Sequence, residues 1–145
     1  MSKISILYGT ESGNSEMAAD DISDTLKDAG FDTEIHPMED YDVHSLTENE
    51  KVILISSTFG EGEFPETTIP FFEALNSTKP NLSTVQFAAF GLGDSTYENY
   101  NNAIDSLVNI FSDLGAIQVG STGKHDAAKG ADLSETAISW AQATF

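Results

Sequence analysis

Thr10-Glu11-Ser12-Gly13-Asn14-Ser15 joins a short apolar run, Ile4 to Tyr8, to a helical pattern. Small and hydroxyl-bearing residues at such a junction leave backbone N–H groups and hydroxyls free at the positive end of a helix dipole. These groups can bind a phosphate dianion without Lys or Arg, and the stretch contains neither. We therefore predict a phosphate site here, with an ordinary hydroxyl-rich N-cap turn as the alternative.

Short apolar runs alternate with helical patterns along the whole chain. This alternation predicts an α/β fold in which helices cover both faces of a parallel sheet, as one domain over residues 1–145. The segment Asp40–Glu50 is acidic and predicts a loop or a weak helix, and the last helix should bury Ile138 and Trp140. The predicted strands are Lys3–Tyr8, Asp32–His36, Val52–Ile55, Val85–Leu92 and Ile117–Val119, and the predicted helices are Ser15–Ala29, Thr67–Leu75, Tyr100–Leu114 and Leu133–Phe145.

Ligands of parallel α/β sheets bind beyond the carboxyl ends of the strands, so the loops after the first, third and fourth strands should meet. Phe59 lies on the glycine-containing second loop, where stacking on a planar ring would explain an aromatic side chain better than loop packing does. Tyr97, on the third loop, is the second candidate for stacking. Tyr100 is better explained as the first core residue of the next helix. Together the loops indicate a planar heterocycle with a phosphate tail.

Other functions are disfavoured by what the sequence lacks. No Lys follows the glycines of the first turn, which argues against nucleoside triphosphate hydrolysis, and no G-x-G-x-x-G fingerprint is present. The chain has no cysteine, and its three histidines are too far apart in sequence to indicate a metal site. Six basic and 24 acidic residues give a net charge of −18, which disfavours nucleic acid and anionic membranes as partners. The charge indicates either a basic protein partner or adaptation to salt.

Three motifs in order resemble those of the flavodoxins. They are Thr-x-Ser-Gly-Asn-Ser at residue 10, Ser-Thr-Phe-Gly-Glu-Gly at residue 57 and Leu-Gly-Asp-x-x-Tyr-x-x-Tyr-Asn at residue 92. The second and third are similar to the FMN domains of cytochrome P450 reductase and sulfite reductase, whereas the length and the segment 79–87 resemble short-chain, MioC-type flavodoxins. The resemblance implies a three-layer, five-stranded parallel sheet of order 2-1-3-4-5. The interval between Gly115 and Leu133 leaves no room for the insertion that splits the last strand of long-chain members.

The resemblance also implies non-covalent binding of FMN. Carried over by position, the phosphate side comprises Thr10, Glu11, Ser12, Gly13, Asn14 and Ser15; one side of the flavin ring comprises Ser57, Thr58, Phe59, Gly60, Glu61 and Gly62; and the other comprises Leu92, Gly93, Asp94, Tyr97, Asn99, Tyr100 and Asn101. The segment Gly120–Gly130, with His125 and Asp126, is expected near the flavin edge.

The implied function is that of a low-potential electron carrier. It would pass single electrons from a flavodoxin/ferredoxin–NADP reductase, an NADPH-dependent flavoprotein, to reductive enzymes with basic surfaces. The N-terminus shows no leader, and the chain has no apolar run of spanning length, so we expect a cytoplasmic protein. We also expect a monomer that, given its charge, binds neither nucleic acid nor membrane. Two alternatives stay open at this point. One is a small FMN-dependent quinone or nitro reductase, and the other is a flavin-free module such as a signalling receiver.

Overall fold

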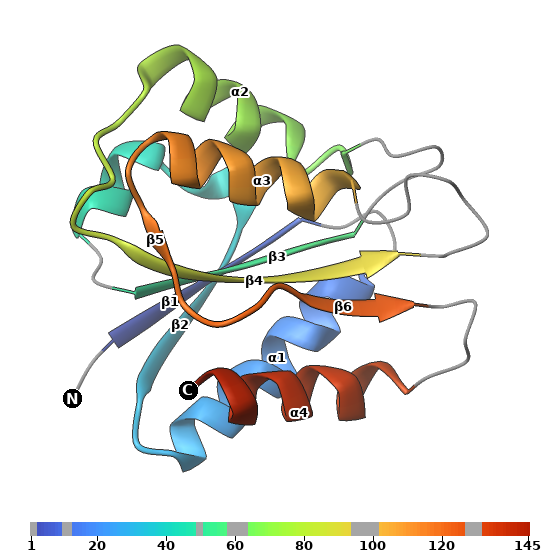
Figure 1. Cartoon of the computed structure of the whole chain (residues 1–145). Coiled ribbons are helices and arrows are strands. Elements are labelled where there is room, and N and C mark those ends of the chain that lie inside the picture. The colour runs from blue at the N-terminus through green and yellow to red at the C-terminus, as the bar shows by residue number, and fades with distance from the viewer. Residues whose placement is uncertain (1–2, 10–12, 49–50, 58–63, 94–101, 127–131) are drawn as a thin grey trace.

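The computed structural model describes residues 3–9, 13–48, 51–57, 64–93, 102–126 and 132–145. Its centre is a parallel sheet of order β2-β1-β3-β4-β5, with a further strand, β6, paired to β4 (Figure 1). The predicted fold class and strand order are therefore confirmed, and β6 is additional. The strands are β1 Lys3–Gly9, β2 Asp32–Pro37, β3 Lys51–Ser57, β4 Gln86–Gly93, β5 Ile117–Gln118 and β6 Gly123–Asp126.

Helices cover both faces of this sheet. The helices α1 (Asn14–Asp28) and α4 (Leu133–Thr144) lie on one face, and α2 (Ile69–Thr78) and α3 (Asn102–Asp113) lie on the other (Figure 1). All four fall where the helical patterns predicted them, although α2 begins and ends later than expected. Pro70 sits in its first turn, where a missing N–H breaks no helical bond.

Strand β3 shows why the sequence requires two covering layers. Ile53 and Ile55 pack against α1 and α4, while Val52 and Leu54 pack under α2 and α3. Successive side chains of a strand point to opposite faces, so an unbroken apolar run buries both of them. Within the α2–α3 layer, Phe111 lies 5.3 Å from Phe87 between ring centroids.

The prediction of which residues the last helix buries was wrong. Ala137 and Ala141 are its fully buried residues, whereas Ile138 and Trp140 remain partly exposed. Small residues are buried because α4 packs closely on α1. Trp140 instead packs at the margin, with its ring 5.4 Å from that of Phe90 and its Nε1 donating to the Ser121 carbonyl oxygen at 3.1 Å.

The last strand is divided into two pieces. β5 has only two residues, which pair with Gln86 and Phe87, and β6 pairs with Phe90–Gly93. β6 thereby covers the carboxyl half of β4, which the short β5 leaves unpaired. Close packing at the start of β6 requires glycine, because a Cβ at Gly123 would lie 2.5 Å from Cδ1 of Trp140.

The acidic segment after β2 forms two 3-10 helices, Met38–Asp40 (η1) and Val43–Glu48 (η2). They bury Met38, Val43 and Leu46 beside α2. The sequence predicted a loop or weak helix here because these apolar residues follow neither a regular α-helical nor a strand period. In the described part of the chain, no helix combines the length and apolarity needed to cross a membrane.

Candidate functional site

The carboxyl ends of the central strands lie side by side at one end of the sheet, which we call the carboxyl edge. Gly9 is opposite Ser56, Ser57 is opposite Leu92, and Gly93 is opposite Asp126. The first turns of α1 and α3 lie at the same edge (Figure 1). The three segments predicted to bind the ligand therefore begin side by side, as expected for a parallel sheet.

The first turn of α1 contains a buried hydroxyl that no described residue satisfies. Its N-cap is Gly13, with φ +88°, a left-handed conformation that strongly favours glycine, so the N-cap residue itself offers no side-chain cap. Ser15 is completely buried, and its Oγ has no hydrogen-bond partner within the part of the chain described. A buried hydroxyl without a partner costs about 1–3 kcal/mol, so a ligand oxygen at this turn would relieve it.

A second buried polar group lies beneath the end of β1. The Thr68 hydroxyl, just before α2, is 3.2 Å from the Ser56 hydroxyl and 3.6 Å from Sδ of Met38. Gly9 lies against this group so closely that a Cβ there would be 1.7 Å from Oγ1 of Thr68. The contact ties the ends of β1 and β3 to the start of α2, which fixes where the first and second loops leave the sheet.

Tyr8 and Glu16 connect the two ends of the first loop. The Tyr8 hydroxyl, near the end of β1, donates to Oε2 of Glu16 in the first turn of α1 at 3.1 Å. Burial raises the pKa of the Tyr8 phenol first of all, and the bond to Glu16 and the carboxylates of Glu16, Asp20 and Glu39 raise this pKa further. The phenol therefore stays protonated and serves as a neutral donor among acids.

The edge is also bordered by β6. His125 is opposite Leu92, and Asp126 is opposite Gly93, so β6 ends beside the start of the third loop. That the segment Gly120–Gly130 approaches the flavin edge stays a prediction. Lys124, the residue before His125, forms an exposed 3.5 Å ion pair with Asp105 of α3, an arrangement that contributes little to stability.

Only part of the predicted site falls within the described residues. Asn14 is exposed beside the buried Ser15, Ser57 and Gly93 are half-buried at strand ends, and the side chain of Leu92 is buried in the core. These residues, with Gly13, lie at the same edge. The other predicted site residues lie outside the described residues; they are Thr10, Glu11, Ser12, Thr58, Phe59, Gly60, Glu61, Gly62, Asp94, Tyr97, Asn99, Tyr100 and Asn101.

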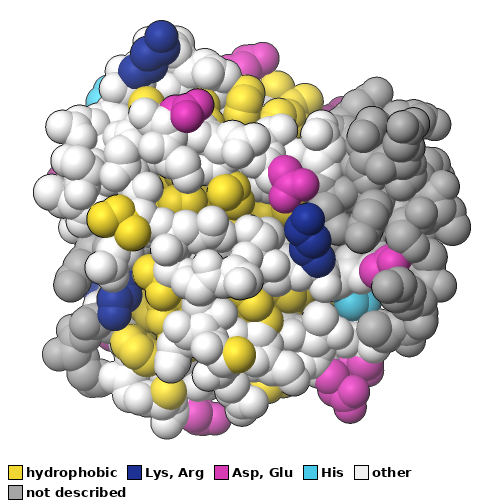
Figure 2. All heavy atoms as spheres, viewed as in Figure 1, with side chains coloured by type: hydrophobic (Ala, Val, Ile, Leu, Met, Phe, Trp, Pro, Cys, Tyr) yellow, Lys and Arg dark blue, Asp and Glu magenta, His cyan; other side chains and the backbone are white. Residues whose placement is uncertain are grey.

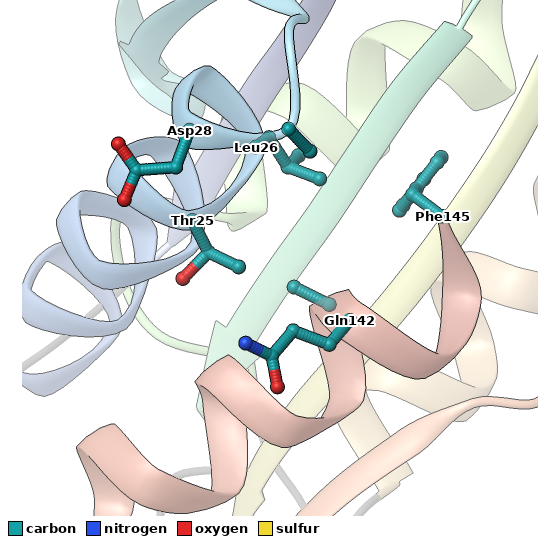
Figure 3. A pocket seen from close by; sticks show the side chains of 7 residues that line it. Thr25, Leu26, Asp28, Gln142 and Phe145 are labelled. Carbon is teal, nitrogen blue, oxygen red and sulfur yellow. The ribbon is translucent and has the colours of Figure 1, made fainter.

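Cavities lined by described residues also lie away from this edge. One, of about 290 Å³, opens between the last turns of α1 and α4, where Leu26 and Phe145 line it and the Asp28 carboxylate points outward (Figure 3). Another, of about 250 Å³, lies between α2 and α3. Within the described segments, no group of three or more His, Asp or Glu could hold a metal ion.

Sequence reasoning missed the contacts that support the loops. Ser56 and Thr68 are polar residues next to apolar runs, which signals that they need a buried partner, but their separation of twelve positions does not identify it. The Tyr8–Glu16 bond, between residues eight apart, gave no signal either.

Comparisons with known proteins agree with this geometry. The flavodoxin family model matches residues 6–140. Protein MioC of Escherichia coli K12 is 37% identical over 125 residues, covering 84% of this chain and 82% of its own length. The sulfite reductase [NADPH] flavoprotein alpha-component of Neisseria meningitidis (strain FAM18) is 36% identical over 114 residues, or 78% of this chain and 19% of that protein.

A solved structure gives the same result at the level of the fold. Oxidised flavodoxin 2 from Bacillus cereus superposes with a TM-score of 0.88 at 30% identity, covering 99% of this chain and 97% of its own. The family model, the similar proteins and the sheet order agree. The chain belongs to the flavodoxin family of electron-transfer flavoproteins, whose cofactor is FMN.

Proposed function

We propose that this protein is a one-electron carrier over residues 1–145. FMN would lie at the carboxyl edge of the sheet, with its phosphate on the first turn of α1 and its ring between the second and third loops. Gly13, Asn14 and Ser15 would hold the phosphate together with Thr10, Glu11 and Ser12. Ser57 to Gly62 and the segment from Leu92 to Asn101 would lie along the ring. The bound flavin supplies the redox chemistry, while the protein binds and orients it.

The Ser15 hydroxyl is the observation that carries this proposal. It is a buried donor without a partner in the described chain, in the first turn of a helix whose N-cap is glycine. Backbone N–H groups of the first turn and this hydroxyl form a donor set suited to a phosphate. Because the phosphate would satisfy the hydroxyl, bound FMN should turn a destabilising group into a stabilising one.

Ser15→Ala tests the phosphate site through two opposite effects, a more stable apoprotein and weaker binding of FMN. The apoprotein should become more stable by about 1 kcal/mol, since a buried hydroxyl without a partner is removed. The Kd for FMN should rise about tenfold or more, because a hydrogen bond to a charged phosphate is lost, while the Kd for riboflavin stays unchanged. Flavin fluorescence titration of the apoprotein measures both dissociation constants.

Ser23→Ala is the matched control on the same helix. Ser23 is also buried, but its hydroxyl lies 2.6 Å from that of Thr33. The control should destabilise the protein and leave the ratio of the FMN and riboflavin dissociation constants at the wild-type value. If Ser15→Ala also leaves that ratio unchanged, the phosphate does not bind at this turn.

We further propose that α1 docks the redox partners. Glu16, Asp20 and Asp24 are exposed at successive i, i+4 positions of this helix. On the face shown in Figure 2, Asp and Glu side chains are spread over the surface and do not gather in one patch. An acidic row that starts beside the flavin site suits a partner with a basic face, such as an NADPH-dependent flavoprotein reductase.

Rapid mixing with such a reductase tests the docking surface. The second-order rate of electron transfer should fall steeply as salt is added, because screening shortens the range of the attraction. Asp20→Asn with Asp24→Asn should lower the rate at low salt, whereas Glu73→Gln, an exposed position on α2 across the sheet, should not. A rate that is independent of salt and of these variants would contradict the proposal.

A carrier also differs from an enzyme in its requirement for a second protein. NADPH should reduce a quinone through this protein only when a separate reductase is present. Steady turnover without the reductase would favour a small FMN-dependent quinone or nitro reductase instead. The cytoplasmic location and the monomeric state stay predictions, and gel filtration tests the latter.

A further inference from the structure

The carboxylate of Glu16 lies in the same first turn of α1 that would receive the phosphate. Glu16 is the third residue of the helix, a position from which an acidic side chain commonly turns back toward the backbone N–H groups at the helix start. In that position it would compete with a phosphate for the same donors and would repel the dianion. Some contact must therefore keep this side chain away from the turn.

The structure shows the Glu16 side chain bonded elsewhere. Its Oε2 accepts a hydrogen bond from the Tyr8 hydroxyl at 3.1 Å, so the carboxylate lies toward the end of β1. Tyr8 itself is anchored, because its ring packs against the core between the sheet and the layer of α1 and α4. A neutral donor anchored at the core thus holds the exposed carboxylate of Glu16 in one place.

We propose that Tyr8 is a positioning residue for cofactor binding: its hydroxyl holds the Glu16 carboxylate off the turn where the phosphate of FMN binds. This inference rests on the proposed phosphate site at Ser15. It adds that affinity for FMN depends on a residue that contributes no group to the phosphate itself. It also accounts for an acidic residue beside an anion site in a turn that lacks basic residues.

Tyr8→Phe keeps the ring and removes only the hydroxyl, so the protein should fold. The released carboxylate should raise the Kd for FMN about three- to fivefold at low salt, which is the range of an exposed charge interaction. Riboflavin lacks the phosphate, so its Kd should not change. High salt should shrink the difference between Tyr8→Phe and the wild type.

Glu16→Gln separates a charge effect from a structural one. In the Tyr8→Phe background it should restore the Kd for FMN to within about twofold of the wild-type value, because the repelling charge is gone. Asp20→Asn, one turn further along the same face, is the matched control and should not restore it. By itself, Glu16→Gln should bind FMN at least as tightly as the wild type.

Each outcome has a defined reading. The role of Tyr8 is overturned if Tyr8→Phe leaves the Kd for FMN unchanged, or raises the Kd for FMN and for riboflavin equally. It is also overturned if the double variant binds FMN as weakly as Tyr8→Phe does. Each of these results leaves the phosphate site intact. Wild-type protein that binds FMN no more tightly than riboflavin overturns the proposed site and this inference together.

Discussion

For Gly9→Ala, the local backbone conformation and the tertiary contacts predict opposite changes in stability. Gly9 ends β1 and is not among the glycines with positive φ. Alanine should be acceptable to such a backbone and, by restricting the unfolded chain, should stabilise the protein by about 0.4–1 kcal/mol. The tertiary contacts of Gly9 predict the reverse.

The magnitude follows from what a Cβ would meet. It would lie 1.7 Å from Oγ1 and 3.0 Å from Cβ of Thr68, and 3.2 Å from Sδ of Met38. Thr68 is completely buried, so its side chain can escape only by rotating and giving up the contact with Ser56. Overpacking costs about 1–3 kcal/mol and a lost buried hydrogen bond about 1 kcal/mol, so we expect a net loss of about 2–4 kcal/mol.

Urea unfolding of the apoprotein measures this loss as a lower midpoint at an unchanged slope. Thr68→Ala removes the atom that clashes most, so Gly9→Ala should cost less in that background, with a coupling of about 1–3 kcal/mol. The reasoning fails if Gly9→Ala raises the midpoint, or if the two substitutions are additive.

Three further predictions concern other parts of the molecule. Gly123→Ala should destabilise the protein by about 1–3 kcal/mol, because the new methyl group overlaps the ring of Trp140, and the fluorescence of this single tryptophan should change. Asp132→Ala should cost about 1 kcal/mol in thermal or urea unfolding, since Asp132 caps α4 by accepting a first-turn N–H at 3.0 Å, whereas Asp132→Asn should cost much less. The raised pKa of Tyr8 means that the native state holds the phenolic proton more tightly than the unfolded chain does. This contribution to stability is complete below pH 10.0 and is lost as the pH rises through the native pKa. The difference in tyrosinate absorbance between the wild type and Tyr8→Phe reports the titration of Tyr8, and its midpoint should lie above pH 10.0. Glu16→Gln should lower this midpoint; an unmoved midpoint would mean that the Glu16 bond does not raise the pKa.

The layers of the fold were predictable from local pattern. An unbroken β-branched run such as Val52–Ile55 is stable only where both faces of a strand are covered. The phosphate turn stays a prediction, and its signal is also local, because it lies in consecutive residues whose backbone and hydroxyl groups would act together. The strand order came from the family resemblance, and the sheet pairings confirm it.

Contacts between distant residues had no such local signal. The division of the last strand depends on which half of β4 is left unpaired, and Ala137 rather than Trp140 is buried because of how closely two helices pack. The hydroxyl of Thr68 against Gly9, and that of Tyr8 on Glu16, depend on side-chain directions set by the assembled sheet. The sequence by itself determined the sheet layers, the covering helices and the residue types of the first turn, since these follow from neighbouring residues. Only the tertiary structure decided which side chains support that turn, because packing brings them together from separate elements.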